Sequence, residues 1–247
     1  MTKPKEKSPA TWLTPSLNTS MGPFVRFALL AAAVVGLRAE TLDEILARMD
    51  QSARSFRTFS AKIKRTEFTK VLPNDKDETD GIRRLKRING QTIGIVEFFG
   101  KNPETIRFAG KTVETYYPNA KRVDVYDASK FGKVGKQVDQ LLLLGIGVTS
   151  ADLRRDFAIT ANGTETIGGK PTTRLELVPK DKDLKKQAEK VELWIPEGDS
   201  VPLQSKVTRT SGDYNQILYS DIQMNPTLPD SAFELNVPAD VKRVNVK

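Results

Sequence analysis

Apolar and polar residues alternate in short segments between residues 59 and 224, and Gly, Asn or Pro separates each segment from the next. In the first segment, Phe59, Ala61 and Ile63 alternate with polar residues. Because successive side chains of a strand point to opposite faces, this pattern predicts strands with one buried and one solvated face. Turn signals about every eight to twelve residues are typical of an antiparallel meander. We therefore expect about ten or eleven strands, without the alternating strand and helix order of nucleotide-binding folds.

Residues 41–56 predict an amphipathic helix in front of the strands. Thr41 can cap this helix, and Glu44 three residues later completes a capping box. Apolar residues follow at steps of three and four, so that they form one stripe that must pack on a sheet or on another helix. These residues are Leu42, Ile45, Leu46, Met49, Ala53 and Phe56.

Four further segments depart from the strand pattern. Residues 130–145 and 150–157 have helix-like patterns, and Ser150 is the expected N-cap of the second. Residues 72–81 are rich in turn formers and predict a mobile hairpin loop. Residues 181–190 are too polar for the core, so we expect a solvated helical turn or loop there.

The amino-terminal part of the chain contains an apolar stretch at residues 24–37, which only Arg26 interrupts. A transmembrane helix needs about 20 apolar residues, so a stretch of this length favours a cleavable signal peptide over a lone membrane anchor. The small residue Ala39 precedes Glu40 at a plausible cleavage site. Met21 is an alternative start of translation.

Cleavage before Glu40 divides the chain into an N-terminal extension with its signal peptide, residues 1–39, and a single domain, residues 40–247. The first part holds five basic side chains and one acidic side chain, so the other 208 residues have a formal net charge of +4 instead of +8. Such a small charge does not indicate binding to nucleic acid, which needs a clustered basic patch. Because the chain has no Cys, it cannot be a lipid-anchored precursor. We therefore expect a soluble periplasmic protein that begins near Glu40.

The chain also has no His. Without His and Cys, a Ser-His-Asp triad, a thiol nucleophile and imidazole or thiolate metal ligands are excluded. Carboxylate pairs such as Glu165 with Glu176, or Glu189 with Glu192, could flank a sugar in a glycosidase. On an exposed sheet face, however, such residues more often lie beside Lys and Arg. An enzyme is therefore disfavoured, and we expect neither a metal nor a cofactor.

Residues 162–171 include a Gly-rich segment whose spacing partly matches that of a phosphate-binding loop. Gly163 and Gly168 have the required separation, but Gly169 stands where that loop needs Lys, and no Ser or Thr follows Lys170. The flanking segments predict two strands instead of a strand that leads into a helix. A hairpin turn at Gly168 and Gly169 is the better interpretation.

Residues 141–148, LLLLGIGV, form the most informative apolar run of the domain. Four consecutive Leu residues cannot all lie on one narrow stripe of a helix, so at least one should face away from the core. Two interpretations remain open: a helix fully buried in a large core, or a helix that plugs the mouth of a sheet-lined cavity. A curved sheet of about ten strands can enclose more volume than its side chains fill, and such cavities take apolar ligands.

Several motifs of the sequence occur in the order that a known family has. They are KNP-x-x-I-R-F from Lys101, a YYP-N-x-K hairpin, RLELVPK at 174–180 and a closing N-x-x-L-x-x-x-x-F-x-L-x-x-P. The closing motif is formed by Asn225, Leu228, Phe233, Leu235 and Pro238. From about Leu42 to Val241 the chain resembles the periplasmic lipoprotein carrier family LolA.

The resemblance implies a half-open antiparallel β-barrel of about eleven strands, with a helical lid over an apolar cavity. It also implies a monomeric, non-enzymatic carrier without cofactors. The implied partners are acylated lipoproteins, the inner-membrane ABC transporter that releases them and, where one exists, an outer-membrane acceptor. An alternative on the same fold is a sensor or regulator that binds lipids or lipoproteins of the envelope.

The resemblance and the two-residue alternation together assign candidate lipid-binding residues. For each of them, ordinary packing in the core is the alternative. The expected cavity wall consists of Phe99, Ile106, Phe108 and Tyr116, and the lid is expected to contribute Leu141 and Leu144.

One position departs from the family pattern. In the family, an Arg before the Pro of the KNP motif helps to hold the lid shut. Here Asn102 occupies that position, between Lys101 and Pro103. Lys101 is the nearest cation that could replace the Arg, so Lys101 and Asn102 are the candidates for the lid latch.

Overall fold

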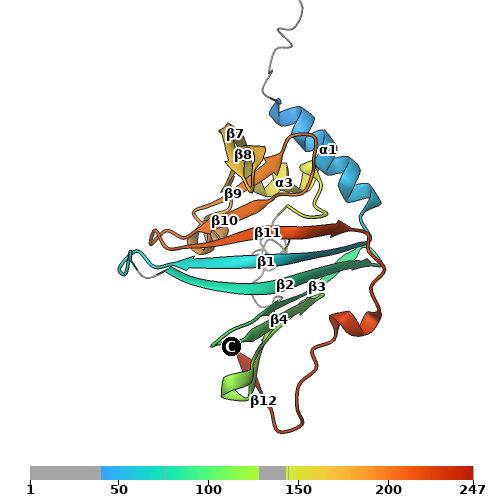
Figure 1. Ribbon diagram of the computed structural model, residues 1–247, viewed down its shortest axis with the longest axis vertical. Coiled ribbons are helices and arrows are strands. Elements are labelled where there is room, and N and C mark those ends of the chain that lie inside the picture. Colours follow the sequence, from blue (N-terminus) through green and yellow to red (C-terminus); the bar gives the residue numbers. More distant parts are fainter. Residues whose placement is uncertain (1–39, 75, 128–142, 144, 247) are drawn as a thin grey trace, which may run out of the picture. The chain divides into compact units, whose positions relative to one another are not determined.

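The computed structural model describes residues 40–246 except 75, 128–142 and 144. These residues belong to one compact unit of the chain, Ala39–Lys247. The unit consists mainly of β-strands with a few helices (Figure 1). None of the helices in the described ranges has the length and the apolar content that a membrane crossing requires.

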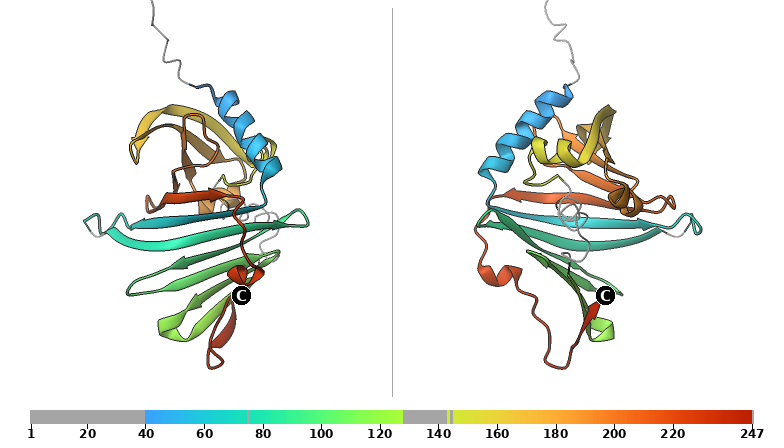
Figure 2. Two further views of the ribbon diagram at one scale, coloured as in Figure 1. Left: turned by 45° about the vertical axis from the view of Figure 1, so that its right-hand side comes forward. Right: turned by 180° about the vertical axis from the view of Figure 1, so that it is seen from behind.

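Twelve strands within the described ranges form one sheet, in the order β12-β6-β5-β4-β3-β2-β1-β11-β10-β9-β8-β7. Neighbouring strands are antiparallel, except that β12 runs parallel to β6. The sheet curves without closing, because its end strands β12 and β7 do not pair with each other (Figure 2). The expected fold class, a mainly β and half-open antiparallel sheet, is therefore confirmed. The strands are β1 (Thr58–Phe68), β2 (Lys76–Ile88), β3 (Gln91–Phe98), β4 (Glu104–Ala109), β5 (Thr112–Tyr117), β6 (Arg122–Asp127), β7 (Phe157–Ile167), β8 (Lys170–Pro179), β9 (Lys190–Pro196), β10 (Gln204–Thr208), β11 (Tyr214–Met224) and β12 (Lys242–Val246).

The first helix forms as predicted. The Thr41 hydroxyl accepts a hydrogen bond from the backbone N–H of Glu44 at 3.3 Å, and the Glu44 carboxylate accepts one from the Thr41 N–H at 2.8 Å. This capping box satisfies two backbone donors at the start of the helix. The helix lies beside α3 near the β7–β9 end of the sheet (Figures 1 and 2). The helices with defined bounds are α1 (Leu42–Ser55), η1 (Pro118–Ala120), α3 (Ser150–Asp156), α4 (Lys182–Gln187) and η3 (Asp230–Phe233).

The strand register assigns side chains to two faces of the sheet. We call inner the face that carries Phe59, Ala61 and Ile63 of β1, all of which are at most 3% exposed. Residues paired with these on neighbouring strands share this face, because directly opposed side chains point to the same side. The main hydrophobic core lies on the inner face, and the buried stripe of α1 belongs to it. Its largest fully buried side chains include Ile45, Met49, Phe56, Phe59, Leu85, Ile146, Leu175, Leu193 and Ile195.

The loop expected at residues 72–81 is shorter than predicted. β2 already begins at Lys76, which pairs with Phe68 at the end of β1. The long strand β1 offers backbone hydrogen bonds to residues whose own composition favours a turn, and such pairing overrides a weak local preference. The prediction of a loop was therefore wrong for residues 76–81.

Two predictions about short helices also need correction. The N-cap of α3 is Thr149 and not Ser150, because the Thr149 hydroxyl accepts the backbone N–H of Asp152 at 3.1 Å. Residues 181–190 do contain the expected helical turn, α4, but Leu184 within it is fully buried. One apolar side chain thus attaches this polar segment to the core.

The Gly-rich segment is the predicted hairpin turn. Gly168 and Gly169 connect β7 to β8 with φ angles of 56° and 80°. Positive φ angles are easily adopted only by a residue without a Cβ atom. Lys170 begins a strand instead of a helix, so the segment lacks the geometry of a phosphate-binding loop.

The described part of the Leu-rich run packs into the core. Ile146 is 1% exposed, and the glycines on either side of it have positive φ angles. A Cβ atom on Gly145 would lie 2.8 Å from the Leu193 side chain, and one on Gly147 would lie 2.7 Å from the Phe56 ring. The close approach of this backbone to α1 and β9 therefore requires glycine at both positions.

The segment after β11 crosses the outer face of the sheet before β12 joins β6 (Figure 2). It buries Phe233 in η3, and Arg107 Nε donates a hydrogen bond to the Phe233 carbonyl at 2.9 Å. Lys86 forms an ion pair with Asp230, and its ammonium lies 5.9 Å from the centre of the Phe233 ring. The register places both Lys86 and Arg107 on the outer face, so this segment covers the face opposite to the core.

Candidate functional site

Two pockets lie along the part of the sheet formed by β1–β6. The first has a volume of about 380 Å³, and we name it the Phe108 pocket. It combines an apolar wall with several polar groups at its edge. Its lining residues are Arg87, Gly90, Gln91, Thr92, Phe108, Gly110, Lys111, Leu143, Gly147, Val148 and Asp152.

Phe108 contributes both to this pocket and to the core. Its side chain is 5% exposed and belongs to the core cluster. Its ring lies against Gly94 on the neighbouring strand, where a Cβ atom would be 2.2 Å from Phe108 Cζ. Ile106, two residues earlier on the same face, is partly buried and packs against the same cluster. The structure thus brings together two of the four residues expected on the cavity wall.

Tyr116 lies on the opposite face from these two residues. Val113 is paired with Phe108, so the inner positions of β5 include Val113 and Tyr117, and Tyr116 points to the other side. The prediction therefore placed Tyr116 on the wrong face of the sheet. An error of one residue in register has this consequence because the side-chain period of a strand is two.

The residues expected to form the lid are described only in part. Leu141 and Leu144 lie outside the described residues. Leu143, which stands between them, is partly buried, packs against the core cluster and lines the Phe108 pocket. At least one residue of the Leu-rich run therefore borders the same space as Phe108.

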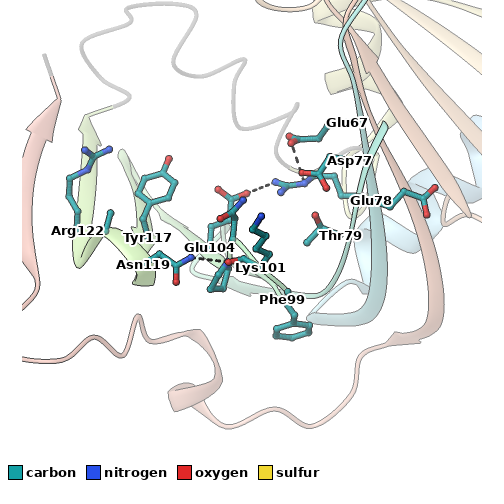
Figure 3. A pocket seen from close by; sticks show the side chains of 15 residues that line it. Glu67, Asp77, Glu78, Thr79, Phe99, Lys101, Glu104, Tyr117, Asn119 and Arg122 are labelled. Atoms are coloured by element: carbon teal, nitrogen blue, oxygen red, sulfur yellow. Dashed lines mark hydrogen bonds and ion pairs between the residues drawn. The ribbon is translucent and has the colours of Figure 1, made fainter. Parts of the chain in front are cut away.

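The second pocket has a volume of about 600 Å³, and we name it the Glu104 pocket (Figure 3). Phe99, expected on the cavity wall, belongs to its lining but is 46% exposed and points away from Glu104 and Lys101 (Figure 3). The structure does not bring Phe99 together with Phe108. The lining consists of Arg65, Glu67, Asp77, Glu78, Thr79, Phe99, Gly100, Lys101, Asn102, Pro103, Glu104, Tyr117, Asn119, Ala120 and Arg122.

Both candidates for the lid latch belong to the loop between β3 and β4, which lines this second pocket. Lys101 and Asn102 are exposed. The Lys101 carbonyl accepts a hydrogen bond from Asn119 Nδ2 at 2.9 Å, which ties the loop to η1 (Figure 3). The loop thus places both residues at the solvent-exposed edge of the Glu104 pocket.

An ion pair between Arg65 and Glu104 lies within this pocket. The two side chains are 13% and 17% exposed, and the Arg65 guanidinium is 3.8 Å from the centre of the Phe98 ring. A charge at this depth needs an opposite charge or an aromatic face, because burial removes its hydration. Burial also raises the pKa of Tyr117 beside this pair, so its phenol is neutral at neutral pH.

Arg87 lines the Phe108 pocket, and its charge is compensated in a different way from that of Arg65. Its guanidinium donates hydrogen bonds to the carbonyls of Ala53, at 2.7 Å, and Gly147. It also lies 4.9 Å from the centre of the Phe56 ring. Burial lowers the pKa of Arg87, but a guanidinium remains charged at neutral pH. Arg87 therefore links α1, β2 and the segment before α3.

Arg83 is the residue that sequence reasoning missed. Its side chain is on the inner face, and the residue is 4% exposed. Nη1 donates a hydrogen bond to the Tyr219 hydroxyl at 3.3 Å, and this hydroxyl lies 3.4 Å from Ser205 Oγ. Nε and Nη2 have no hydrogen-bond partner among the described residues. Basic residues occur on both faces of β2, so the alternation of apolar and polar residues in the sequence does not single out Arg83.

The described part of the chain holds no group of three or more His, Cys, Asp or Glu residues that could bind a metal ion. What its inner face offers is apolar surface together with guanidinium groups. Such a surface can bind a molecule with an apolar body and a polar or charged end.

Comparison with known families supports an envelope location. Residues 43–247 match the model of a family described as predicted periplasmic protein (DUF2092). The chain belongs to this family. No protein of curated function matches the sequence.

Solved structures with similar folds have low sequence identity to this member of the family. The crystal structure of an uncharacterized conserved protein from Thermus thermophilus has a TM-score of 0.50 at 12% identity, and the match covers 84% of this chain and 100% of that chain. The MucA/MucB complex of Pseudomonas aeruginosa has a TM-score of 0.45 at 12% identity, covering 82% and 63% of the two chains. A LolA superfamily protein from Nitrosomonas europaea has a TM-score of 0.40 at 16% identity, covering 80% and 99%. At these identities the likeness concerns the fold alone.

Proposed function

We propose that this protein is a non-enzymatic periplasmic carrier, which binds the acyl chains of lipoproteins released from the inner membrane and delivers them to the outer membrane. The observation that supports this most is the Phe108 pocket, where the apolar inner face borders a space of about 380 Å³. The description of the family as periplasmic agrees with a role in the envelope. The sequence, without His and Cys, supplies few groups for catalysis.

Partial burial of an acyl chain is sufficient for such a role. Each CH₂ group removed from water stabilises the complex by about 0.8 kcal/mol, so a few groups already give useful affinity. A pocket that leaves part of the chain exposed also allows its release. Among the described residues, Ile106 and Phe108 are the proposed contacts with the acyl chain.

A charge placed on the inner face beside Phe108 tests this assignment. We expect Ile106→Glu to lower the affinity for a fluorescent fatty acid about tenfold or more, because the carboxylate would lie where the chain should lie. Since Ile106 is partly buried, the new charge can reach water, and the unfolding temperature should move by only a few degrees. The matched control is Thr105→Glu, which places the same charge on the outer face of the same strand.

Binding is measured by fluorescence titration of the protein isolated from the cell envelope. Equal affinity of the two variants and the unaltered protein would refute Ile106 as a contact of the acyl chain. Mass spectrometry of the same preparation tests the carrier role separately. Acylated lipoprotein that copurifies supports the carrier, whereas a single membrane protein in its place would favour the sensor.

A further inference from the structure

Arg83 is a buried cation that the described part of the fold does not neutralise. It is 4% exposed, and two of its three nitrogen atoms have no hydrogen-bond partner among the described residues. A buried charge without a counter-charge costs several kcal/mol, because the protein does not replace its hydration. Nothing in the packing of β2 requires this cost, since an apolar side chain of similar length would fill the same position.

Two other arginines on the inner face have partners that compensate their buried charge. Arg65 has the carboxylate of Glu104 and the ring of Phe98. Arg87 has two backbone carbonyls and the ring of Phe56. In contrast, the one described partner of Arg83 is the neutral hydroxyl of Tyr219, at 3.3 Å.

The surroundings of Arg83 combine apolar surface with hydroxyl groups. The register places it between Ala61 of β1 and Val96 of β3, both buried. Tyr219 and Ser205, which are 3% and 1% exposed, bring two hydroxyl groups to the same region. A hydroxyl can accept the Arg83 N–H and still donate its own hydrogen. The group as a whole thus presents donors to an acceptor that carries negative charge.

Arg83 lies midway between the two pockets along β2. Thr79 lines the Glu104 pocket, Arg87 lines the Phe108 pocket, and Arg83 is four residues from each on the same face. At about 3.3 Å per residue, each pocket begins about 13 Å away along the strand. The length of a long acyl chain is therefore sufficient to span the distance from Arg83 to either pocket.

We propose that Arg83, together with the Tyr219 hydroxyl, binds the anionic group of an acyl ligand. The preferred ligands are amphiphiles that carry a carboxylate or a phosphate next to the acyl chain, and neutral amphiphiles bind less tightly. A guanidinium suits both anions, because its planar N–H groups match two oxygen atoms at once. This inference rests on the proposed acyl binding and extends the ligands from lipoproteins to free amphiphiles with a charged end.

The test compares a fluorescent fatty acid with its methyl ester, which has the same chain without the charge. We expect the unaltered protein to bind the acid about tenfold or more tightly than the ester. Arg83→Met should reduce the ratio of acid to ester affinity to about one, because it weakens the binding of the acid alone. The matched control is Arg84→Met, because Arg84 is on the outer face of the same strand, paired with Glu97, and should leave the ratio unchanged.

Two further measurements distinguish a role of Arg83 in binding from a merely structural role. Arg83→Met should leave the unfolding temperature unchanged or raise it, because it removes a charge without a counter-charge. Tyr219→Phe keeps the ring and removes one donor, so it should lower the ratio of acid to ester affinity by a smaller factor than Arg83→Met. If Arg83→Met does not fold, Tyr219→Phe provides the test.

Competition with lysophosphatidic acid and with inorganic phosphate distinguishes the sources of the anion. Displacement of the probe by lysophosphatidic acid supports a lipid phosphate, and binding of the fatty acid alone supports a carboxylate. Displacement of the probe by inorganic phosphate at the same concentration would show that the site binds a free anion. This result would overturn the proposal of an amphiphilic ligand. Equal affinity for acid and ester in the unaltered protein overturns the role of Arg83 but leaves acyl binding intact. If neither probe binds, the proposed function itself fails.

Discussion

Asn225 holds the carbonyl of Ser55 at the end of α1, although the two residues are at opposite ends of the domain sequence. Asn225 Nδ2 donates to the Ser55 carbonyl at 3.1 Å, and Asn225 Oδ1 accepts the backbone N–H groups of Arg57, at 2.7 Å, and Thr58, at 3.2 Å. One side chain thus satisfies three backbone groups where the chain passes from α1 into β1. Asn225 itself has a φ angle of 57°, which Asn adopts more readily than most residues.

Asn225→Ala should lower the free energy of unfolding by about 2–3 kcal/mol. The three backbone groups lose their partner, and Ala adopts a positive φ angle only with strain. The control Asn225→Gly loses the same hydrogen bonds but accepts the φ angle, so its loss should be about 1 kcal/mol smaller. Urea unfolding followed by circular dichroism measures both values. Identical losses would show that the backbone conformation contributes nothing.

Gly94→Ala should destabilise the protein by about 1–3 kcal/mol, because the new methyl group overlaps the Phe108 ring. Phe108→Leu in the same chain should recover part of this loss by making room for the methyl group. The double-mutant cycle, measured by urea unfolding, should therefore show a coupling of at least about 0.5 kcal/mol between the two positions. Strict additivity would contradict the close contact.

Asp152 should make the stability of the α3 end depend on pH. The hydrogen bond from the Thr149 hydroxyl, opposed by burial and assisted by Arg155, lowers the pKa of Asp152 in the folded protein. A carboxylate with a lowered pKa stabilises the fold above its usual pKa, and this contribution is lost as the pH falls through the folded pKa.

We therefore expect Asp152→Asn to be less stable than the unaltered protein by about 1 kcal/mol at pH 7. As the pH falls through the lowered folded pKa of Asp152, its carboxyl group becomes protonated and the two proteins should converge. Thermal unfolding across this pH range measures the difference. A gap that stays constant with pH would exclude the charge of Asp152 as its cause.

N-terminal sequencing of the protein from the envelope fraction tests the proposed export. We expect a mature protein that begins at or near Glu40, because Ala39 provides the small residue that signal peptidase needs. Osmotic shock should release it with the periplasmic fraction. Retention of Met1 or Met21 on a membrane-bound protein would overturn this proposal.

Local patterns were sufficient for the predicted elements that depend on nearby residues. The capping box of Thr41 and Glu44, the turn at Gly168 and Gly169 and the alternation of β1 all involve short spacings, and all three are confirmed. The extent of β2 was missed because it depends on pairing with β1, which turn-forming residues do not reveal.

The candidate site was harder to predict than the fold. Ile106 and Phe108 share a face because alternation within one strand is visible in the sequence. Tyr116 was placed on the wrong face because the register between β4 and β5 depends on the turn that joins them, and adjacent tyrosines give no signal for which one points inward. Arg83 was missed because its lack of hydrogen-bond partners depends on which residues surround it in space. The spacing of residues in the sequence does not reveal those neighbours.

The pairing of β1 with β11 has a consequence for the rate of folding. Apart from β12, which pairs with the distant strand β6, the strands on each side of this pair are joined to neighbours that are adjacent in sequence. Such contacts form early because the loops that they close are short. The seam between the halves pairs Phe68 with Tyr214 and Phe59 with Met224, and closing so long a loop is slow. Until the seam forms, β1 and β11 both present open edges on which a second molecule can pair. The interval between synthesis of the chain and closure of this seam is therefore the period in which the chain is most exposed to aggregation.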